Sequence, residues 1–226
     1  MMIDACMSDV ITHERREDFS HCHFVGPKRV LDRSVFTLGA SGGRPAAYKI
    51  IVSDSEFQGK LNFLLGSGEG TVRIDGKGSM NIAFRLYRYV SIHIKEGTTI
   101  NQARIVCDNS EISVGRNGLW SDEIIVQSND QHGIIDLETL KPINAGRRKI
   151  FIDDHVWVGR RSMIMPDVEI GRESIIAACA CVTSDVESNS IYAGVPARKI
   201  RSGITWSRSP NGLSEYELDF LGYARQ

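Results

Sequence analysis

A six-residue repeat between Ile152 and Val186 constrains the fold of this 226-residue chain more than any other feature. β-Branched apolar residues recur every six positions, and a second series of small or β-branched residues runs four positions behind the first. An α-helix repeats every 3.6 residues and a plain strand every two, so neither produces this pattern. The first series is Ile152, Val158, Ile164, Ile170, Ile176 and Val182, and the second is Val156, Ser162, Val168, Ser174, Ala180 and Val186.

A six-residue unit has room for one short strand and one corner. Three units then close one triangular turn of a parallel β-helix, and successive turns stack at the roughly 4.8 Å spacing of paired strands. The β-branched side chains form columns in the core. Small residues follow the first series at Gly159, Gly171 and Ala177, and we expect the corner glycines to supply a positive φ. The repeat therefore predicts an all-β solenoid.

The period continues upstream with less regularity, at Ile94, Ile100, Val106, Ile112 and Ile124, and irregular coils are predicted from about residue 48. The interval from 124 to 152 is not a multiple of six, so a segment is inserted within it. The polar, turn-rich stretch Leu137–Lys149 is the predicted loop. A loop that leaves a regular solenoid tends to carry function.

The two ends of the chain lack the repeat. Residues 1–46 are polar and irregular in sequence, and we expect them to cap the first coil, whose end would otherwise be an unpaired edge. Residues 47–201 are predicted to form the solenoid, interrupted by the loop 137–149. Residues 202–226 form a tail, in which 212–223 are predicted to contain a short helix begun by Ser214.

Composition bounds the class of protein. The 27 Lys and Arg nearly balance the 28 Asp and Glu, which argues against a dedicated nucleic-acid-binding protein. Five cysteines at irregular spacing favour free thiols in a reducing compartment over a disulfide framework. We see no signal peptide, and no stretch approaches the roughly 18 apolar residues of a membrane helix. We therefore expect a soluble, cytoplasmic protein without a membrane span.

Three stretches together resemble the hexapeptide-repeat acyltransferases. They are IFIDDHVWVGRRSMIMPDVEIGRESIIAACACVTSDV, the exit motif AGVPARKIR at Ala193–Arg201, and Gln127–His132 just before the inserted loop. The sequence is most similar to the branch that O-acetylates sugars, which includes maltose and galactoside acetyltransferases and the acetyltransferases of capsular polysaccharides. The resemblance implies a left-handed parallel β-helix, acetyl-CoA as acyl donor, and a homotrimer with its active sites between subunits.

Acyl transfer from a thioester to a hydroxyl requires a general base for the alcohol and N–H donors for the oxyanion. An imidazole, with an ordinary pKa of roughly 6.5, suits the first task. His132 lies where the resemblance puts the catalytic histidine, and Asn129 and Asp130 are near enough in sequence to orient it. We assign no direct role to His155, in an outward hexad position, or to His93, in an early coil.

The resemblance implies an acyl-CoA groove between stacked coils. Basic residues suit the phosphates of CoA, and Arg208 is a candidate extension of the basic cluster at the exit motif. Trp206 is a candidate for stacking on adenine, whereas packing is expected for Trp157. The cofactor-binding candidates are Trp157, Gly159, Arg160, Ala178, Thr183, Arg198, Lys199 and Arg201.

The sequence therefore predicts acetyl-CoA-dependent O-acetylation of a sugar hydroxyl in a capsular or other surface polysaccharide, or in its precursor. Two alternatives stay open: N-acetylation of an amino-sugar nucleotide, and a non-catalytic β-helix scaffold or binding module. A metal hydratase would need three histidines converging on zinc, and His93, His132 and His155 lack a matching spacing. No metal site is predicted.

Overall fold

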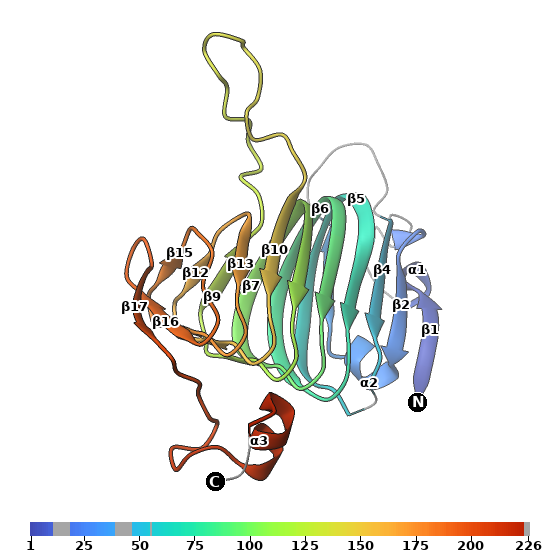
Figure 1. The fold of residues 1–226 in the computed structure, drawn as a ribbon. Coiled ribbons are helices and arrows are strands. Elements are labelled where there is room, and N and C mark those ends of the chain that lie inside the picture. The colour runs from blue at the N-terminus through green and yellow to red at the C-terminus, as the bar shows by residue number, and fades with distance from the viewer. Residues whose placement is uncertain (11–18, 39–46, 55, 224–226) are drawn as a thin grey trace.

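The computed structural model describes residues 1–10, 19–38, 47–54 and 56–223. Its strands wind into coils that stack along one axis, from the N-terminal strands at one end to β16 and β17 at the other (Figure 1). The helices are α1 (Met7–Val10), α2 (Lys28–Leu31) and α3 (Glu215–Leu221). The strands are β1 (Met2–Cys6), β2 (His23–Pro27), β3 (Val35–Leu38), β4 (Ala47–Val52), β5 (Gln58–Ile74), β6 (Ser79–Ile94), β7 (Thr99–Val114), β8 (Leu119–Trp120), β9 (Ile124–Gln127), β10 (Arg148–Ile152), β11 (Trp157–Val158), β12 (Met163–Ile164), β13 (Val168–Ile170), β14 (Ile175–Ile176), β15 (Cys181–Val182), β16 (Ser190–Ala193) and β17 (Arg198–Ser202).

Parallel pairing between strands of successive coils builds three faces. Face 1 consists of β10, β13 and the last part of β7. Face 2 consists of β8, β11, β14 and β16. Face 3 consists of β9, β12, β15 and the middle part of β7. In the early coils the long strands β5, β6 and β7 bend around the corners and pair over most of their length. The predicted all-β, left-handed parallel β-helix is confirmed.

The core consists of the residue columns that the repeat predicts. All twelve residues of the two hexad series are buried, with Val186 the most exposed at 3%. Burial of each Val or Ile side chain contributes about 1.5–3 kcal/mol. Ser162 and Ser174 occupy core positions because their hydroxyls donate to the carbonyls of Gly159 and Gly171, each at 2.7 Å, so no buried hydroxyl is left unpaired there.

The corner glycines have a different role from the predicted one. Positive φ falls on non-glycine corner residues, among them His155, Arg161 and Cys179, whereas Gly159 and Gly171 adopt no positive φ. A Cβ at Gly159 would lie 2.6 Å from the backbone nitrogen of Ala178 in the next coil. Glycine is therefore required there by the close approach of two coils, and the prediction that these glycines supply positive φ is wrong.

The described parts of residues 1–46 are regular rather than irregular. β1 pairs with β2 in antiparallel fashion, β2 runs parallel to β4, and β3 runs parallel to β5. Met7 and Phe24 belong to the common core. The prediction of irregular structure does not hold for these residues. Side chains along β2 alternate between exposed and buried positions at its start, as in a strand with one face on the core, so β2 extends the sheet beyond β4. Part of the segment lies outside the described residues, and its role as a cap stays a prediction.

The inserted loop and the C-terminal helix are both present. The loop occupies residues 128–147 and protrudes from the solenoid between β9 and β10 (Figure 1). It starts nine residues before the predicted 137–149, and Arg148 and Lys149 belong to β10. Ser214 is the N-cap of α3 in a capping box with Glu217. None of the five cysteines, all of which are described, forms a disulfide. None of the described helices has the length and apolarity to cross a membrane.

Candidate functional site

The loop that carries His132 leaves the solenoid at the third corner, between faces 3 and 1. Its base is held by Asn144, whose side chain is buried. Asn144 Nδ2 donates to the carbonyl oxygen of His132 at 2.8 Å and to Asp130 Oδ2 at 3.1 Å, and Asn144 Oδ1 accepts from the backbone nitrogen of Ile134 at 2.8 Å. These three bonds fix the backbone on both sides of His132. Asn144 carries no sequence signal beyond its turn-rich surroundings.

The imidazole of His132 is exposed. Asn129 and Asp130 do not orient it. Asn129 Nδ2 donates instead to the carbonyl oxygen of Asp108 at 3.0 Å, and the carboxylate of Asp130 accepts from Asn144. The prediction that these two neighbours position the ring is therefore wrong within a single chain. Both side chains instead make the hydrogen bonds that hold the two ends of the loop together.

An ion pair between half-exposed Arg88 and buried Asp108 supports the same corner from the previous coils. Arg88 makes a bidentate contact with Asp108, at 2.5 Å and 2.6 Å, and the Asp108 side chain is 3% exposed. The hydrogen bond to Asp108 raises the pKa of Arg88. The backbone nitrogen of Asp108 donates to Ser128 Oγ at 3.2 Å, at the first residue of the loop. Sequence reasoning missed this pair, since the two residues are twenty positions apart and share no motif.

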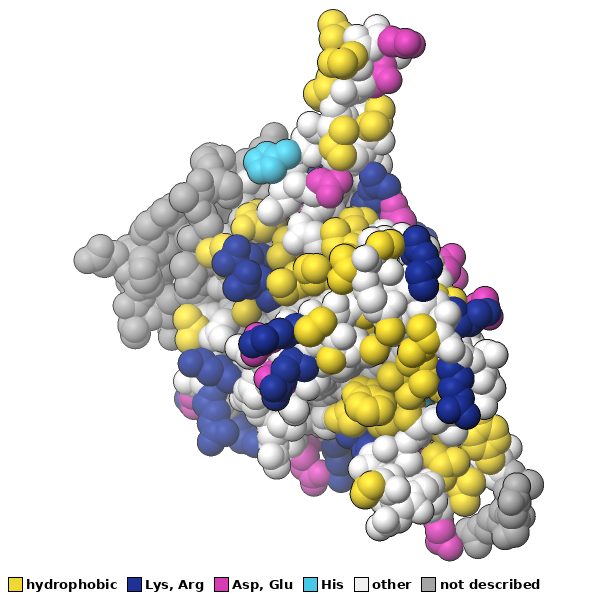
Figure 2. Space-filling model, turned by 90° about the vertical axis from the view of Figure 1, so that its left-hand side faces the viewer, with side chains coloured by type: hydrophobic (Ala, Val, Ile, Leu, Met, Phe, Trp, Pro, Cys, Tyr) yellow, Lys and Arg dark blue, Asp and Glu magenta, His cyan; other side chains and the backbone are white. Residues whose placement is uncertain are grey.

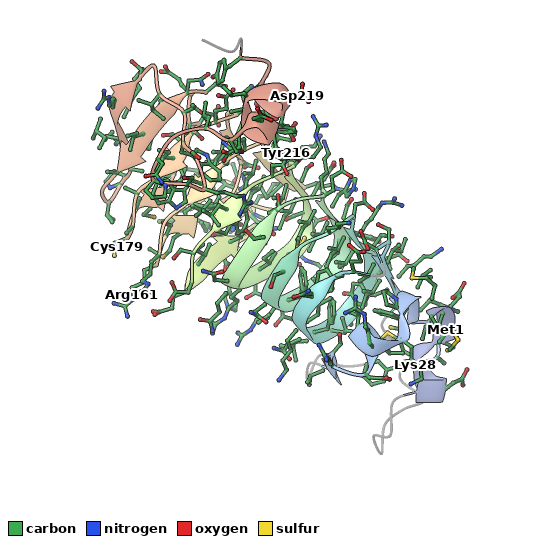
Figure 3. All side chains as sticks on the ribbon, turned by 90° about the horizontal axis from the view of Figure 1, so that it is seen from below. Met1, Lys28, Arg161, Cys179, Tyr216 and Asp219 are labelled. Carbon is green, nitrogen blue, oxygen red and sulfur yellow. The ribbon has the colours of Figure 1, made fainter. Side chains whose placement is uncertain are left out.

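A second group of candidate residues meets at the second corner, between faces 2 and 3. Gly159 packs against Ala178, and the backbone nitrogen of Cys179 donates to the carbonyl oxygen of Arg160 at 2.8 Å. Arg160 Nε donates to Asp122 at 2.8 Å. Arg161 and Cys179 lie next to each other along this edge of the solenoid (Figure 3). Gly159, Arg160 and Ala178 are thus brought together.

The exit motif forms an exposed edge at the end of the solenoid. β17 pairs with β16 in antiparallel fashion, with Arg198 opposite Ala193, and all five of its residues are exposed. Lys199 is neutralised by both carboxylate oxygens of Glu187, each at 2.7 Å. Lys and Arg side chains stand around hydrophobic ones on this end of the molecule (Figure 2).

Arg208 does not extend this basic cluster. Its guanidinium reaches back to the early coils, where it donates to Thr99 Oγ1 at 3.0 Å and to the carbonyl oxygen of Gly118 at 2.9 Å. Burial lowers the pKa of Arg208. The prediction fails because the tail folds back along the first corner, between faces 1 and 2, rather than continuing past β17.

The same tail removes Trp206 and His155 from solvent. Their rings stack with centroids 4.1 Å apart, His155 Nε2 donates to the Trp206 carbonyl at 2.9 Å, and Trp206 Nε1 donates to the His155 carbonyl at 2.8 Å. Trp206 is buried here, so the prediction that it stacks on adenine is wrong. His155 is 1% exposed rather than outward-facing. Trp157 packs beside Trp206, with ring centroids 6.1 Å apart, which agrees with a packing role.

The candidate base and part of the candidate groove lie at opposite ends of face 3. Arg160 and Ala178 precede β12 and β15, at the second corner. His132 follows β9 at the third corner, and Thr183, which follows β15, lies at that same end of the face because β9, β12 and β15 are in register. Among the described residues, no group of three or more His, Cys, Asp or Glu is placed to hold a metal ion.

Residues 149–184 match the family model described as bacterial transferase hexapeptide (six repeats). The polysialic acid O-acetyltransferase of Escherichia coli O1:K1 / APEC is 32% identical over 113 residues, which are 50% of this chain and 36% of that protein. The galactoside O-acetyltransferase of Escherichia coli K12 is 30% identical over 119 residues, 49% of this chain and 54% of that protein. The chain thus spans between about a third and a half of the length of these curated relatives.

A crystal structure of the polySia specific acetyltransferase NeuO superposes with a TM-score of 0.62 at 26% identity, covering 84% of this chain and 94% of that one. The polysialic acid O-acetyltransferase OatWY superposes with a TM-score of 0.53 at 20% identity, covering 84% and 95%, and shows the shared fold. The chain is therefore a parallel β-helix that contains the bacterial transferase hexapeptide repeat and resembles the sugar and polysaccharide O-acetyltransferases built on that repeat.

Proposed function

We propose that this protein is an acetyl-CoA-dependent O-acetyltransferase that acts on a sugar hydroxyl of a capsular or other surface polysaccharide, or of its precursor. The main observation is the placement of His132, which is exposed on a loop base locked by Asn144, at one end of face 3. The names of the relatives, which act on polysialic acid and galactosides, support the same class of reaction.

In the proposed reaction the sugar hydroxyl oxygen attacks the carbonyl carbon of the thioester, and His132 accepts the hydroxyl proton. A C–O bond forms, and backbone N–H groups stabilise the oxyanion of the tetrahedral intermediate. The C–S bond then breaks, and the imidazolium returns the proton to the thiolate of CoA. The residues proposed to hold CoA are Trp157, Gly159, Arg160, Ala178, Thr183, Arg198, Lys199 and Arg201.

We propose a homotrimer with its sites between subunits, in which His132 of one chain faces the groove of another. Two features support this assembly. His132 and Arg160 lie at different corners of one chain, and the protruding loop exposes aliphatic side chains that a neighbour could cover. The most exposed of them are Leu137, Leu140 and Ile143, at 88%, 75% and 67%. We also propose a cytoplasmic location, in line with five cysteines that form no disulfide.

The decisive experiment compares His132→Ala with wild-type protein in acetyl-CoA turnover on polysaccharide acceptors. We expect a loss of at least about a hundredfold, the usual contribution of a general base, with an unchanged oligomer by light scattering. His93→Ala is the matched control, since His93 is held by Asp75 at 2.6 Å on another face. Near-normal turnover by His132→Ala would contradict the assignment.

Two further measurements address the alternatives and the groove. Acceptors that carry only hydroxyls and acceptors that carry an amino group separate O-acetylation from N-acetylation, and an absence of turnover on both would favour a binding scaffold. Arg198→Ala and Arg201→Ala are expected to raise the KM for acetyl-CoA more than they lower kcat, because cations that bind CoA phosphates contribute mainly to binding.

A further inference from the structure

A hollow of about 480 Å³ lies on the outside of the solenoid, along the second corner and the adjoining part of face 3. It crosses five successive coils, those of β5, β6, β7, β9 and β12. Ile125 is in its lining, and the loop that carries His132 begins three residues later at Ser128. The hollow therefore adjoins the proposed site without containing His132.

Cations recur along this hollow at every second coil. Lys60 lies on β5, Arg104 on β7, and Arg161 beside β12. Because paired strands are about 4.8 Å apart, neighbouring cations in this series are separated by roughly 10 Å along the axis. The strand register places Ala83 opposite Asn62 and Arg104 opposite Ala83, so Lys60 lies two residues along its strand from the position level with Arg104.

Two of these cations lack a carboxylate partner. The third cation, Arg161, is paired with Glu123 at 2.7 Å, and this carboxylate also lines the hollow. Lys60 and Arg104 are exposed, and neither makes an ion pair with a described carboxylate. Within the part of the chain that the structure describes, the hollow thus contains two positive charges without a carboxylate partner, which an external anion can balance.

The remaining lining suits a carbohydrate. Asn62 and Gln102 present amides that can bond to hydroxyl groups, whereas the amide of Asn81 is already used, accepting from the Lys60 backbone and donating to the Asn101 carbonyl. The floor includes the apolar side chains of Ala83, Ile125 and Met163. No Phe, Tyr or Trp of the described segments lines the hollow, although single-stranded nucleic-acid grooves use such residues to stack bases.

We propose that this hollow binds the acidic groups of a linear, carboxylate-bearing glycan, with Lys60 and Arg104 as its anion-binding residues. The inference rests on the proposed function, since it identifies the acceptor as an anionic polysaccharide held along the solenoid axis. Lys60 and Arg104 contribute to acceptor binding and take no part in the chemical step. His132 lies at the end of the same face, where a hydroxyl of the bound chain would reach it.

The test measures binding without acetyl-CoA, so that its failure is separate from a failure of the catalytic proposal. The probes are fluorescently labelled polysialic acid, the same polymer with its carboxyl groups reduced, and a single-stranded oligonucleotide of matched length. Wild-type protein should bind polysialic acid in a salt-sensitive way, because exposed ion pairs are screened. The reduced polymer should bind about tenfold more weakly or not at all.

The double variant Lys60→Ala/Arg104→Ala should bind polysialic acid about tenfold more weakly, which corresponds to about 1 kcal/mol or less from each exposed ion pair. The matched control Arg33→Ala/Lys49→Ala removes two exposed cations that do not line the hollow, and it should bind normally. His132→Ala should also bind normally, since it changes only the proposed chemical step.

Three results would overturn the proposal: equal binding of the native and reduced polymers, equal loss in the two double variants, or tighter binding of the oligonucleotide than of polysialic acid. Normal binding by wild-type protein that shows no acetyl transfer would leave the hollow assigned and refute only the proposed reaction. In kinetics, Lys60→Ala/Arg104→Ala should raise the KM for the polymer while kcat stays near the wild-type value.

Discussion

Glu217 is expected to anchor the C-terminal tail through its ionised form. The residue is 5% exposed, and its carboxylate accepts from the backbone nitrogen and hydroxyl of Ser214, both at 2.8 Å, and from Ser207 Oγ and the backbone nitrogen of Arg208, both at 2.9 Å. Burial raises the pKa of Glu217, but these hydrogen bonds outweigh it and lower the pKa from 4.5 to about 2.

The lowered pKa of Glu217 converts into a pH-dependent contribution to folding. Each pKa unit corresponds to 1.36 kcal/mol, so the shift amounts to about 3 kcal/mol. The unfolded chain binds the proton more tightly than the folded one. The contribution is therefore complete above about pH 4.5, decreases as the pH falls, and is lost near pH 2.

The assay is hydrogen exchange of the α3 amides, which reports opening of the tail, in wild-type protein and in Glu217→Gln between pH 6 and pH 2.5. At pH 6 the variant should open more easily by about 3 kcal/mol, and the difference should fall to about 1 kcal/mol at pH 2.5. Asp219→Asn is the control, because Asp219 is an exposed carboxylate on the same helix (Figure 3). A difference between wild type and Glu217→Gln that is the same at both pH values would refute the reasoning.

Three other substitutions test the core, the loop base and the contact between coils. Ile164→Ala should lower the free energy of unfolding by about 2–5 kcal/mol in urea titrations, because a column residue with no exposure leaves a cavity. Asn144→Asp removes the donor to the His132 carbonyl and puts a like charge near Asp130, so kcat should fall by about tenfold or more while circular dichroism shows that the solenoid stays folded; normal kcat would show that the loop base does not position His132. Gly159→Ala forces a Cβ to within 2.6 Å of a backbone atom, and calorimetry should show about 1–3 kcal/mol of destabilisation.

The repeat was sufficient to predict the solenoid, because inward-facing residues in a β-helix recur at the same period as its strands. The interruption of that period revealed an insertion, although not its start, since the polar residues from Ser128 onward read equally well as a corner. The helix after Ser214 was also visible, because a capping box is a local signal. In each case the interacting residues are close in sequence or share one period.

Contacts between distant parts of the chain could be found only in the tertiary structure. The tail buries Trp206 against His155, fifty-one positions away, and so removes both from the candidate site. Asn144 holds His132 across the loop, and the hollow with Lys60 and Arg104 exists only because strands some twenty residues apart in sequence pair side by side. A periodic sequence determines which side chains face inward, whereas the neighbours of the outward-facing ones depend on how coils, loop and tail pack together.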